Sequence, residues 1–155
     1  MSTLMHKRLI PLALAYVGDE EPIDGRTRLQ KMVFVVQQEL AESGDLRRDQ
    51  MYDFFAYDYG PFSKELAEAI DEMIAAGLLN EDEVAYDDDG NIKYLYELNP
   101  EGRRLIEQEL SAAGVQSLFE KARRIKHRFN HELSLPQVID EVYAEYPEYT
   151  ENSIY

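Results

Sequence analysis

Residues 52–79 read YDFFAYDYGPFSKELAEAIDEMIAAGLL, and this stretch predicts an aromatic strand followed by a helix. Aromatic residues at Tyr52, Phe54, Phe55 and Tyr57 suit a half-buried strand, and Gly60-Pro61 interrupts the extended run. A helix is then expected, because a serine stands at the N-cap position, apolar residues recur at helical spacing and a glycine follows. These positions are Ser63, then Leu66, Ile70, Met73 and Ile74, and finally Gly77.

The segment after this helix predicts a β-hairpin. Residues 81–98 read EDEVAYDDDGNIKYLYEL, with Asp89-Gly90 or Gly90-Asn91 at the tip and Tyr94 and Tyr96 alternating along the return strand. A helix followed by a hairpin and another helix indicates a winged helix. The predicted fold class is therefore α+β and mainly helical. We expect a single winged-helix-like domain over residues 1–155, with a β-hairpin wing and flanking N- and C-terminal helices.

Two helices are expected before the aromatic strand. The first covers residues 3–17, with Pro11 near its start or at a kink, and a loop follows over residues 19–25. The second, within GRTRLQKMVFVVQQEL, is apolar enough to be central, and Ser43-Gly44-Asp45 ends it. Its expected buried positions are Leu29, Met32, Val33, Phe34, Val35, Val36 and Leu40.

Three helices are expected after the hairpin. The first begins with Asn99 as its cap and Pro100 in its first turn. After a break at residues 111–114, a longer helix runs to about Asn130. The last helix has a capping box at Ser134 and Gln137, and it ends before Pro147. The apolar stripe of the longer helix is Val115, Leu118, Phe119, Ala122, Ile125 and Phe129.

The composition limits the classes of partner. The 155 residues carry 31 acidic and 16 basic side chains, a formal net charge of −15 that repels nucleic acid overall. The chain either has a partner that is not a polyanion or has a surface adapted to a salt-loaded, halophilic cytoplasm. The absence of cysteine excludes disulfides and thiolate metal sites. The apolar run at residues 9–17 is too short to span a membrane, and a cytoplasmic location is favoured over secretion.

Three short motifs carry a resemblance to a known family. They are Leu29-Gln30-Lys31, then Tyr59-Gly60-Pro61 with Ser63, and Tyr146-Pro147-Glu148-Tyr149. With their surroundings, which cover nearly the whole chain, they resemble the YwgA-like family of uncharacterised prokaryotic proteins and, more distantly, the Panacea and SocA-like antitoxin domains. The resemblance implies a winged-helix-like fold and a regulatory or toxin-neutralising role.

The helix after Ser63 is the first candidate interface. Its outward positions include four acids and one base, which is the wrong sign for contact with DNA phosphates. We therefore favour a protein-binding regulator of antitoxin type, or a homodimer, whose acidic helix and wing dock on a basic surface. The alternative is a plain solvated face. The predicted partner-binding residues are Tyr59, Ser63, Lys64, Glu68, Asp71, Glu72, Tyr86 and Tyr94.

A basic helix face is the second candidate interface, and a DNA-binding transcriptional regulator is the alternative function. Lys121, Arg124 and Arg128 share one helix face. A second group at the start of the central helix extends this surface if folding brings the two together. The competing interpretation is a face occupied by salt bridges. The predicted nucleic-acid-binding residues are Arg26, Arg28, Lys31, Lys121, Arg124 and Arg128.

Weaker signals concern small ligands and catalysis. The hydroxyls of Tyr57 and Tyr59 offer a small anion cradle at the turn, although capping alone explains that turn. His127 and His131 stand at the spacing of a helical metal pair, but no HExxH glutamate lies between them. No P-loop, nucleophile elbow or dinucleotide fingerprint is present. We therefore expect no metal, no cofactor and no enzymatic activity.

Overall fold

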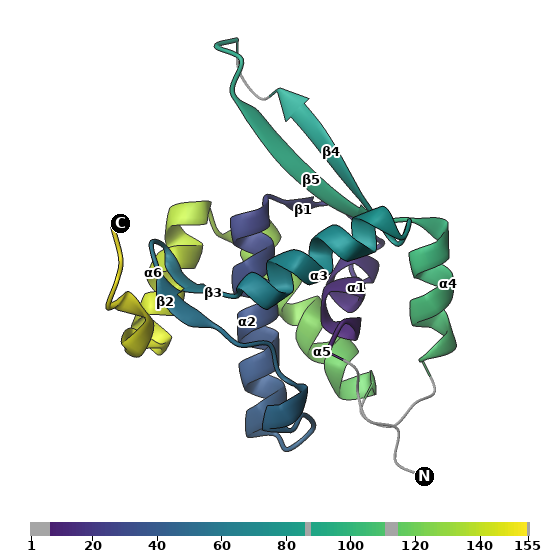
Figure 1. The fold of residues 1–155 in the computed structure, drawn as a ribbon, viewed down its shortest axis with the longest axis horizontal. Coiled ribbons are helices and arrows are strands. Elements are labelled where there is room, and N and C mark those ends of the chain that lie inside the picture. The colour runs from purple at the N-terminus through teal and green to yellow at the C-terminus, as the bar shows by residue number, and fades with distance from the viewer. Residues whose placement is uncertain (1–6, 86–87, 111–114, 155) are drawn as a thin grey trace.

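The computed structural model describes residues 7–85, 88–110 and 115–154. It confirms an α+β, mainly helical fold, in which a long hairpin projects from a helical body (Figure 1). The α-helices are α1 Leu9–Tyr16, α2 Arg26–Glu42, α3 Lys64–Ala75, α4 Pro100–Gln108, α5 Val115–Lys126 and α6 Leu135–Glu145. Shorter turns are the 3-10 helices η1 Arg48–Gln50 and η3 Pro147–Thr150 and the π-helical η2 His127–Glu132.

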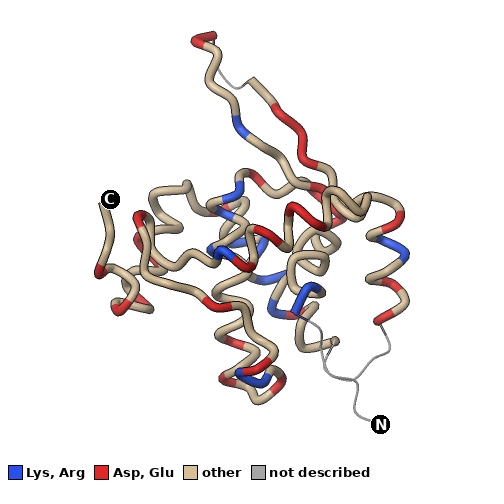
Figure 2. Tube along the Cα trace, viewed as in Figure 1, with Lys and Arg blue, Asp and Glu red and all other residues tan. Residues whose placement is uncertain are grey.

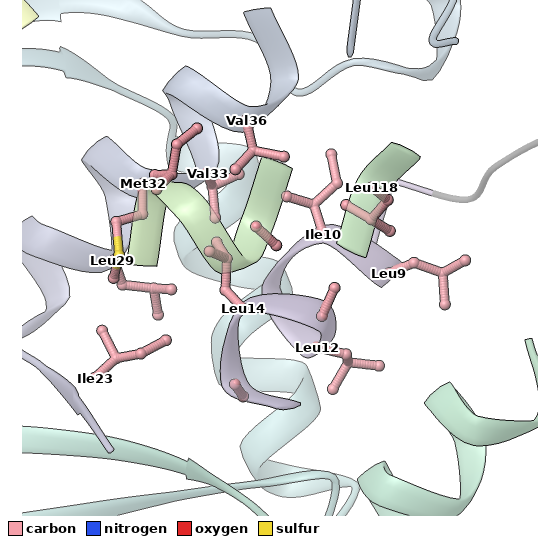
Figure 3. Packing of buried hydrophobic residues seen from close by; sticks show 14 of the residues in the cluster. Leu9, Ile10, Leu12, Leu14, Ile23, Leu29, Met32, Val33, Val36 and Leu118 are labelled. Atoms are coloured by element: carbon pink, nitrogen blue, oxygen red, sulfur yellow. The ribbon is translucent and has the colours of Figure 1, made fainter. Parts of the chain in front are cut away.

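The core is built around α2, as its composition predicts. All seven apolar positions expected on this helix are buried, and α1 is buried from Leu9 to Ala15. Each fully buried aliphatic or aromatic side chain stabilises the fold by about 1.5–3 kcal/mol. Figure 3 shows apolar side chains of α1, α2 and α5 gathered in one cluster. The side chains labelled there are Leu9, Ile10, Leu12, Leu14, Ile23, Leu29, Met32, Val33, Val36 and Leu118.

The predicted hairpin is confirmed, and a third strand joins it. Strands β4 Leu79–Ala85 and β5 Ile92–Leu98 pair antiparallel, and Gly90 between them has a φ of +81°. Strand β1, Ile23–Asp24, pairs with β5 on its other side, so the sheet order is β1-β5-β4. The expectation of a plain loop at residues 19–25 is wrong here, because two residues are too few to show strand periodicity.

The aromatic stretch folds differently from its prediction. β2 Phe55–Tyr57 pairs with β3 Gly60–Phe62, so the chain turns at Asp58-Tyr59 and the extended run continues through Gly60-Pro61. Gly60 is required, because its φ is +99° and a Cβ there would lie 2.8 Å from Cε1 of Tyr143. The side chains of Phe55 and Tyr57 are 60% and 53% exposed, since the two-stranded ribbon is covered on one face only.

The predicted helix limits are confirmed where capping chemistry defines them. Ser63 Oγ accepts a hydrogen bond from the Leu66 N–H at 3.0 Å, and Gly77 follows α3 with a φ of +77°. The capping box of Ser134 and Gln137 is present. Asn99 stands at the cap of α4 as expected, but its side chain makes no capping hydrogen bond.

Other limits need correction. The first described helix begins at Leu9, with Pro11 in its first turn, and the expected start at residues 3–6 lies outside the described residues. The expected break at residues 111–114 also lies outside them. The regular α-helix α5 ends at Lys126, and η2 continues it as a wider turn. In the part of the chain that the structure describes, no helix is both long and apolar enough to cross a bilayer.

Candidate functional site

Helix α3 presents an acidic face to solvent. Its apolar side packs on the core through Leu66, Ile70 and Met73, because these residues recur at helical spacing. The opposite side exposes the predicted residues Lys64, Glu68, Asp71 and Glu72. Glu65, also expected to point outward, is half-buried and forms an ion pair with Lys7.

The hairpin continues this acidic face. Glu81, Asp82 and Glu83 follow one another along the exposed part of β4, and Figure 2 shows acidic residues along both α3 and β4. Burial and a hydrogen bond with Asp82 raise the pKa of the Glu97 carboxyl on β5, which reflects crowding of negative charge. We call the exposed carboxylates of Glu68, Asp71, Glu72, Glu81 and Glu83 the acidic face; Asp82 points to the other side of the hairpin, because side chains alternate along a strand.

The predicted tyrosines and serine fall in different places. Tyr94 is 39% exposed and lies opposite Glu83 on the hairpin, whereas Tyr86 lies outside the described residues. Tyr59 is 46% exposed, but it belongs to the turn between β2 and β3. Ser63 is fully buried, so its side chain caps α3 and is not part of the exposed surface.

Three predicted basic residues at the start of α2 are directed into the protein. Arg26 Nη2 lies 3.0 Å from Asp71 and 2.9 Å from Glu81, and its Nε donates to Tyr96 Oη at 3.0 Å. Arg28 donates to the backbone carbonyls of Asp24, Phe129 and Leu133, and only 11% of its side chain is exposed. Lys31 is buried, with 2% of its surface exposed.

The basic residues of α5 and η2 are directed toward acids. Arg124 pairs with Glu39 of α2, and Arg128 makes a bidentate pair with Glu141 of α6. Lys121 Nζ donates to Ser117 Oγ at 3.1 Å. Arg28 and Lys31 are largely buried and Arg26 is paired with two acids, so the α2 group does not extend an exposed basic surface, which was the condition for the extended site. Arg103, on α4, pairs with Glu20.

A small pocket lies where the anion cradle was expected. Its volume is about 180 Å³, and it opens between the first turns of α2 and the β2–β3 ribbon. The α2 side contributes Arg26, Thr27 and Lys31, and the ribbon contributes Tyr57, Tyr59 and Phe62. The hydroxyls of Tyr57 and Tyr59, expected to form the cradle, both belong to residues of the pocket wall, whereas the Ser63 N–H at the helix start donates to Gln30 Oε1 at 3.0 Å.

Two lysines are buried, and neither forms an ion pair with a carboxylate among the described residues. Lys31 Nζ donates to the Pro61 carbonyl at 3.0 Å, and Lys126 Nζ donates to the Val17 carbonyl at 2.8 Å. Burial lowers the pKa of each amine to about 8, because the charged form loses hydration. Lys126 therefore supplies a hydrogen-bond donor at the C-terminal end of α1, where backbone carbonyls lack helical partners. Lys31 lies in the wall of the small pocket.

The histidine pair is not assembled as a metal site. The rings of His127 and His131 are 5.6 Å apart between centroids, but each imidazole is directed to a different glutamate. His131 pairs with Glu21, and His127 Nε2 lies 3.8 Å from Glu132. Among the described residues, no group of three or more histidine and carboxylate side chains could hold a metal ion.

Sequence reasoning missed two buried amides that position the ribbon. Gln30 exchanges two hydrogen bonds with the backbone of Ser63, and Gln37 does the same with Tyr52, at 2.7 Å and 3.0 Å. The available signal was the occurrence of two polar residues on the buried side of an otherwise apolar helix.

No family model matches the chain, and no curated protein matches it.

Proposed function

We propose that this protein is a winged-helix-like regulator of antitoxin type, related to the YwgA-like family, that binds a protein partner through its acidic face. The element order supports the proposal. Helix α1, strand β1, helices α2 and α3 and strands β4 and β5 occur in the order of a winged helix, with η1 and the β2–β3 ribbon inserted between α2 and α3, and β1 pairs with β5. On this proposal α3 corresponds to the recognition helix and the hairpin to the wing.

The observation that carries the proposal is the sign of the charge at the recognition-helix position. Glu68, Asp71 and Glu72 are exposed there, and the adjacent strand adds Glu81 and Glu83. Arg26 pairs with Asp71 and Glu81, so the surface keeps a net negative charge. DNA affinity comes mainly from neutralising phosphates with basic side chains, so this surface opposes DNA. An acidic surface instead attracts a basic protein surface and steers its approach. A toxin directed at nucleic acid would present such a basic surface. The role is binding, without catalysis or a cofactor.

DNA binding is the second candidate, and one observation favours it. The side chains of Arg124 and Arg128 stay 60% and 47% exposed, so phosphates can reach both guanidinium groups. Binding would then exchange their pairing with Glu39 and Glu141 for phosphate contacts. Surface ion pairs contribute little free energy, about 0–1 kcal/mol, so this exchange is favourable when several phosphates are bound together.

The test is affinity capture from native lysate at low and at high salt, with two charge-matched variants. The face variant carries Glu68→Lys, Glu72→Lys and Glu83→Lys. The control variant carries Glu120→Lys, Glu148→Lys and Glu151→Lys, which are exposed positions away from α3 and β4. Both variants change the net charge by the same amount, so they separate the effect of the acidic face from that of total charge.

A protein retained stoichiometrically by the wild type and the control, but absent from the face variant, supports the proposal. Equal loss from both variants contradicts it, because total charge alone would then explain the capture. Recovery of duplex DNA without a stoichiometric protein favours the second candidate. In that case, replacing Lys121, Arg124 and Arg128 with Glu should abolish binding and reduce the salt slope by about 0.9 for each phosphate that is no longer bound.

A further inference from the structure

The pocket beside the ribbon has walls suited to a small ring. At about 180 Å³ it is close in size to cavities of about 150 Å³ that hold one benzene molecule. Tyr57 and Phe62 stand side by side in its wall, with ring centroids 5.4 Å apart, and Tyr59 adds a third ring. Aromatic walls bind a flat apolar group by stacked or edge-on contacts. The occupant is therefore expected to be a single aromatic ring.

The same pocket contains one positive charge that the protein leaves uncompensated. Lys31 is 2% exposed, and an ammonium group has three N–H donors. Among the described residues, its Nζ donates to the Pro61 carbonyl at 3.0 Å, and burial alone, with no neighbouring carboxylate, lowers the pKa of its amine. Burying a charge without a counter-charge costs free energy, which a bound anion would recover.

The second cation and the amide at the pocket are already engaged. Arg26 is held by Asp71, Glu81 and Tyr96, and Gln30 is bonded twice to the backbone of Ser63. One ammonium between apolar walls suits a singly charged carboxylate. A phosphate group would require several donors to replace its hydration, so it fits this site poorly.

We propose that this pocket binds a small monocyclic aromatic carboxylate, with the carboxylate on Lys31 and the ring against Tyr57, Tyr59 and Phe62. The ligand site is separate from the acidic face and does not depend on the protein partner. Because the α2 side of the pocket ends at Arg26, which holds Asp71 of the acidic face, the two sites meet at one side chain.

The test is a titration of the intact protein with benzoate, followed by heteronuclear NMR of the Lys31 side chain and the Tyr57 and Phe62 rings. Benzamide and acetate are the matched probes, since the first keeps the ring without the charge and the second keeps the charge without the ring. We expect benzoate to shift these resonances saturably. Benzamide and acetate should each bind at least tenfold more weakly. Benzoate affinity should also fall as pH rises above about 8, where Lys31 loses its proton.

Two variants separate the charge from the ring contacts. Lys31→Met should remove benzoate binding while leaving benzamide binding unchanged or stronger. Tyr57→Ala should weaken the binding of benzoate and of benzamide alike. Because Tyr57 is 53% exposed, this variant should fold, so it still tests the proposal if Lys31→Met fails to fold. Equal affinity for benzoate and benzamide, or benzoate shifts confined to residues outside the pocket, would overturn the proposal.

Discussion

Gln30 and Ser63 are joined by two hydrogen bonds, in which the Gln30 amide donates to the Ser63 carbonyl and accepts from the Ser63 N–H, each at 3.0 Å. Both groups are buried, so Gln30→Met would leave a backbone donor and a backbone acceptor without partners. We expect a loss of about 2–4 kcal/mol in the free energy of unfolding, measured by chemical denaturation. The control is Gln108→Met on the exposed end of α4, which should change it by less than about 0.5 kcal/mol. Equal midpoints for the two variants would contradict the pairing.

Gly102 of α4 packs against the turn between α3 and β4. A Cβ at this position would lie 2.2 Å from the Leu78 carbonyl oxygen, so Gly102→Ala must displace α4 or that turn. Alanine favours a helix by about 1 kcal/mol over glycine, but the overlap should outweigh this gain and lower the melting temperature. Glu101→Ala, at the neighbouring exposed position, serves as the control. A melting temperature above that of the wild type would show that the close approach is absent in solution.

Because Lys126 is buried, the free energy of unfolding should rise as the pH increases above about 8. Burial lowers the pKa of this amine from 10.5 to about 8, so the unfolded chain binds more protons than the folded chain between those two values. The free energy of unfolding therefore rises with pH across this window, by on the order of 2 kcal/mol per lysine. Lys31 contributes in the same direction.

The measurement is urea denaturation of the wild type and Lys126→Met from pH 7.5 to pH 10. The variant should show a shallower rise, because only Lys31 then contributes. Above pH 10 the trend should reverse, since burial raises the pKa of Tyr96 and Tyr146 to about 12 and the unfolded tyrosines ionise first. Parallel curves for the two proteins below pH 10 would show that Lys126 is hydrated in solution.

Tyr52 and Tyr96 are both buried, but only one hydroxyl has a partner. The Tyr52 hydroxyl has no hydrogen bond in the described part of the chain, so Tyr52→Phe should leave stability unchanged or raise it. Tyr96 Oη bonds to Arg26 and to Glu81, and Tyr96→Phe should cost about 1–3 kcal/mol. Thermal unfolding of the two variants at one pH provides the comparison. A larger loss for Tyr52→Phe would reveal a hydroxyl partner.

Salt should stabilise the fold. The net charge of −15 makes the folded chain repel itself, and added salt screens that repulsion over a Debye length that falls to about 3 Å at molar concentration. The melting temperature should therefore rise with potassium chloride concentration. Equal or higher melting temperatures without salt would remove the halophilic interpretation.

The features that were predictable from sequence depend on short-range chemistry. The Ser63 cap, the capping box at Ser134 and the hairpin were found because each involves neighbouring residues with characteristic side chains. The buried face of α2 was found because its apolar positions form a helical period. Each of these features is therefore specified by residues within one helical turn or one strand pair of it.

The missed features depend on contacts between distant segments. Strand β1 has two residues and exists because β5 passes beside it. The pairing of Gly60-Pro61 with β2 was missed, because a Gly-Pro pair usually ends an extended segment. Here Tyr143 lies against Gly60, and Lys31 donates to the Pro61 carbonyl. For the candidate site, the sequence predicted the acidic positions of α3. For Arg124 and Arg128 it also gave a salt-bridged face as the competing interpretation, and the structure shows these pairs, but the sequence could not name Glu39 of α2 and Glu141 of α6 as the partners.

The position of β1 also affects the order in which the chain can fold during its synthesis. Ile23 pairs with Tyr96, and Asn130 bonds to the backbone at Pro22 and Asp24. A ribosome adds about 5–20 residues per second, so several seconds pass before these partners emerge. Until then α1 and α2 are present without the partner strand of β1. A bound chaperone, or a pause in translation, would therefore act most strongly on the nascent chain in the interval before Asn130 has been added.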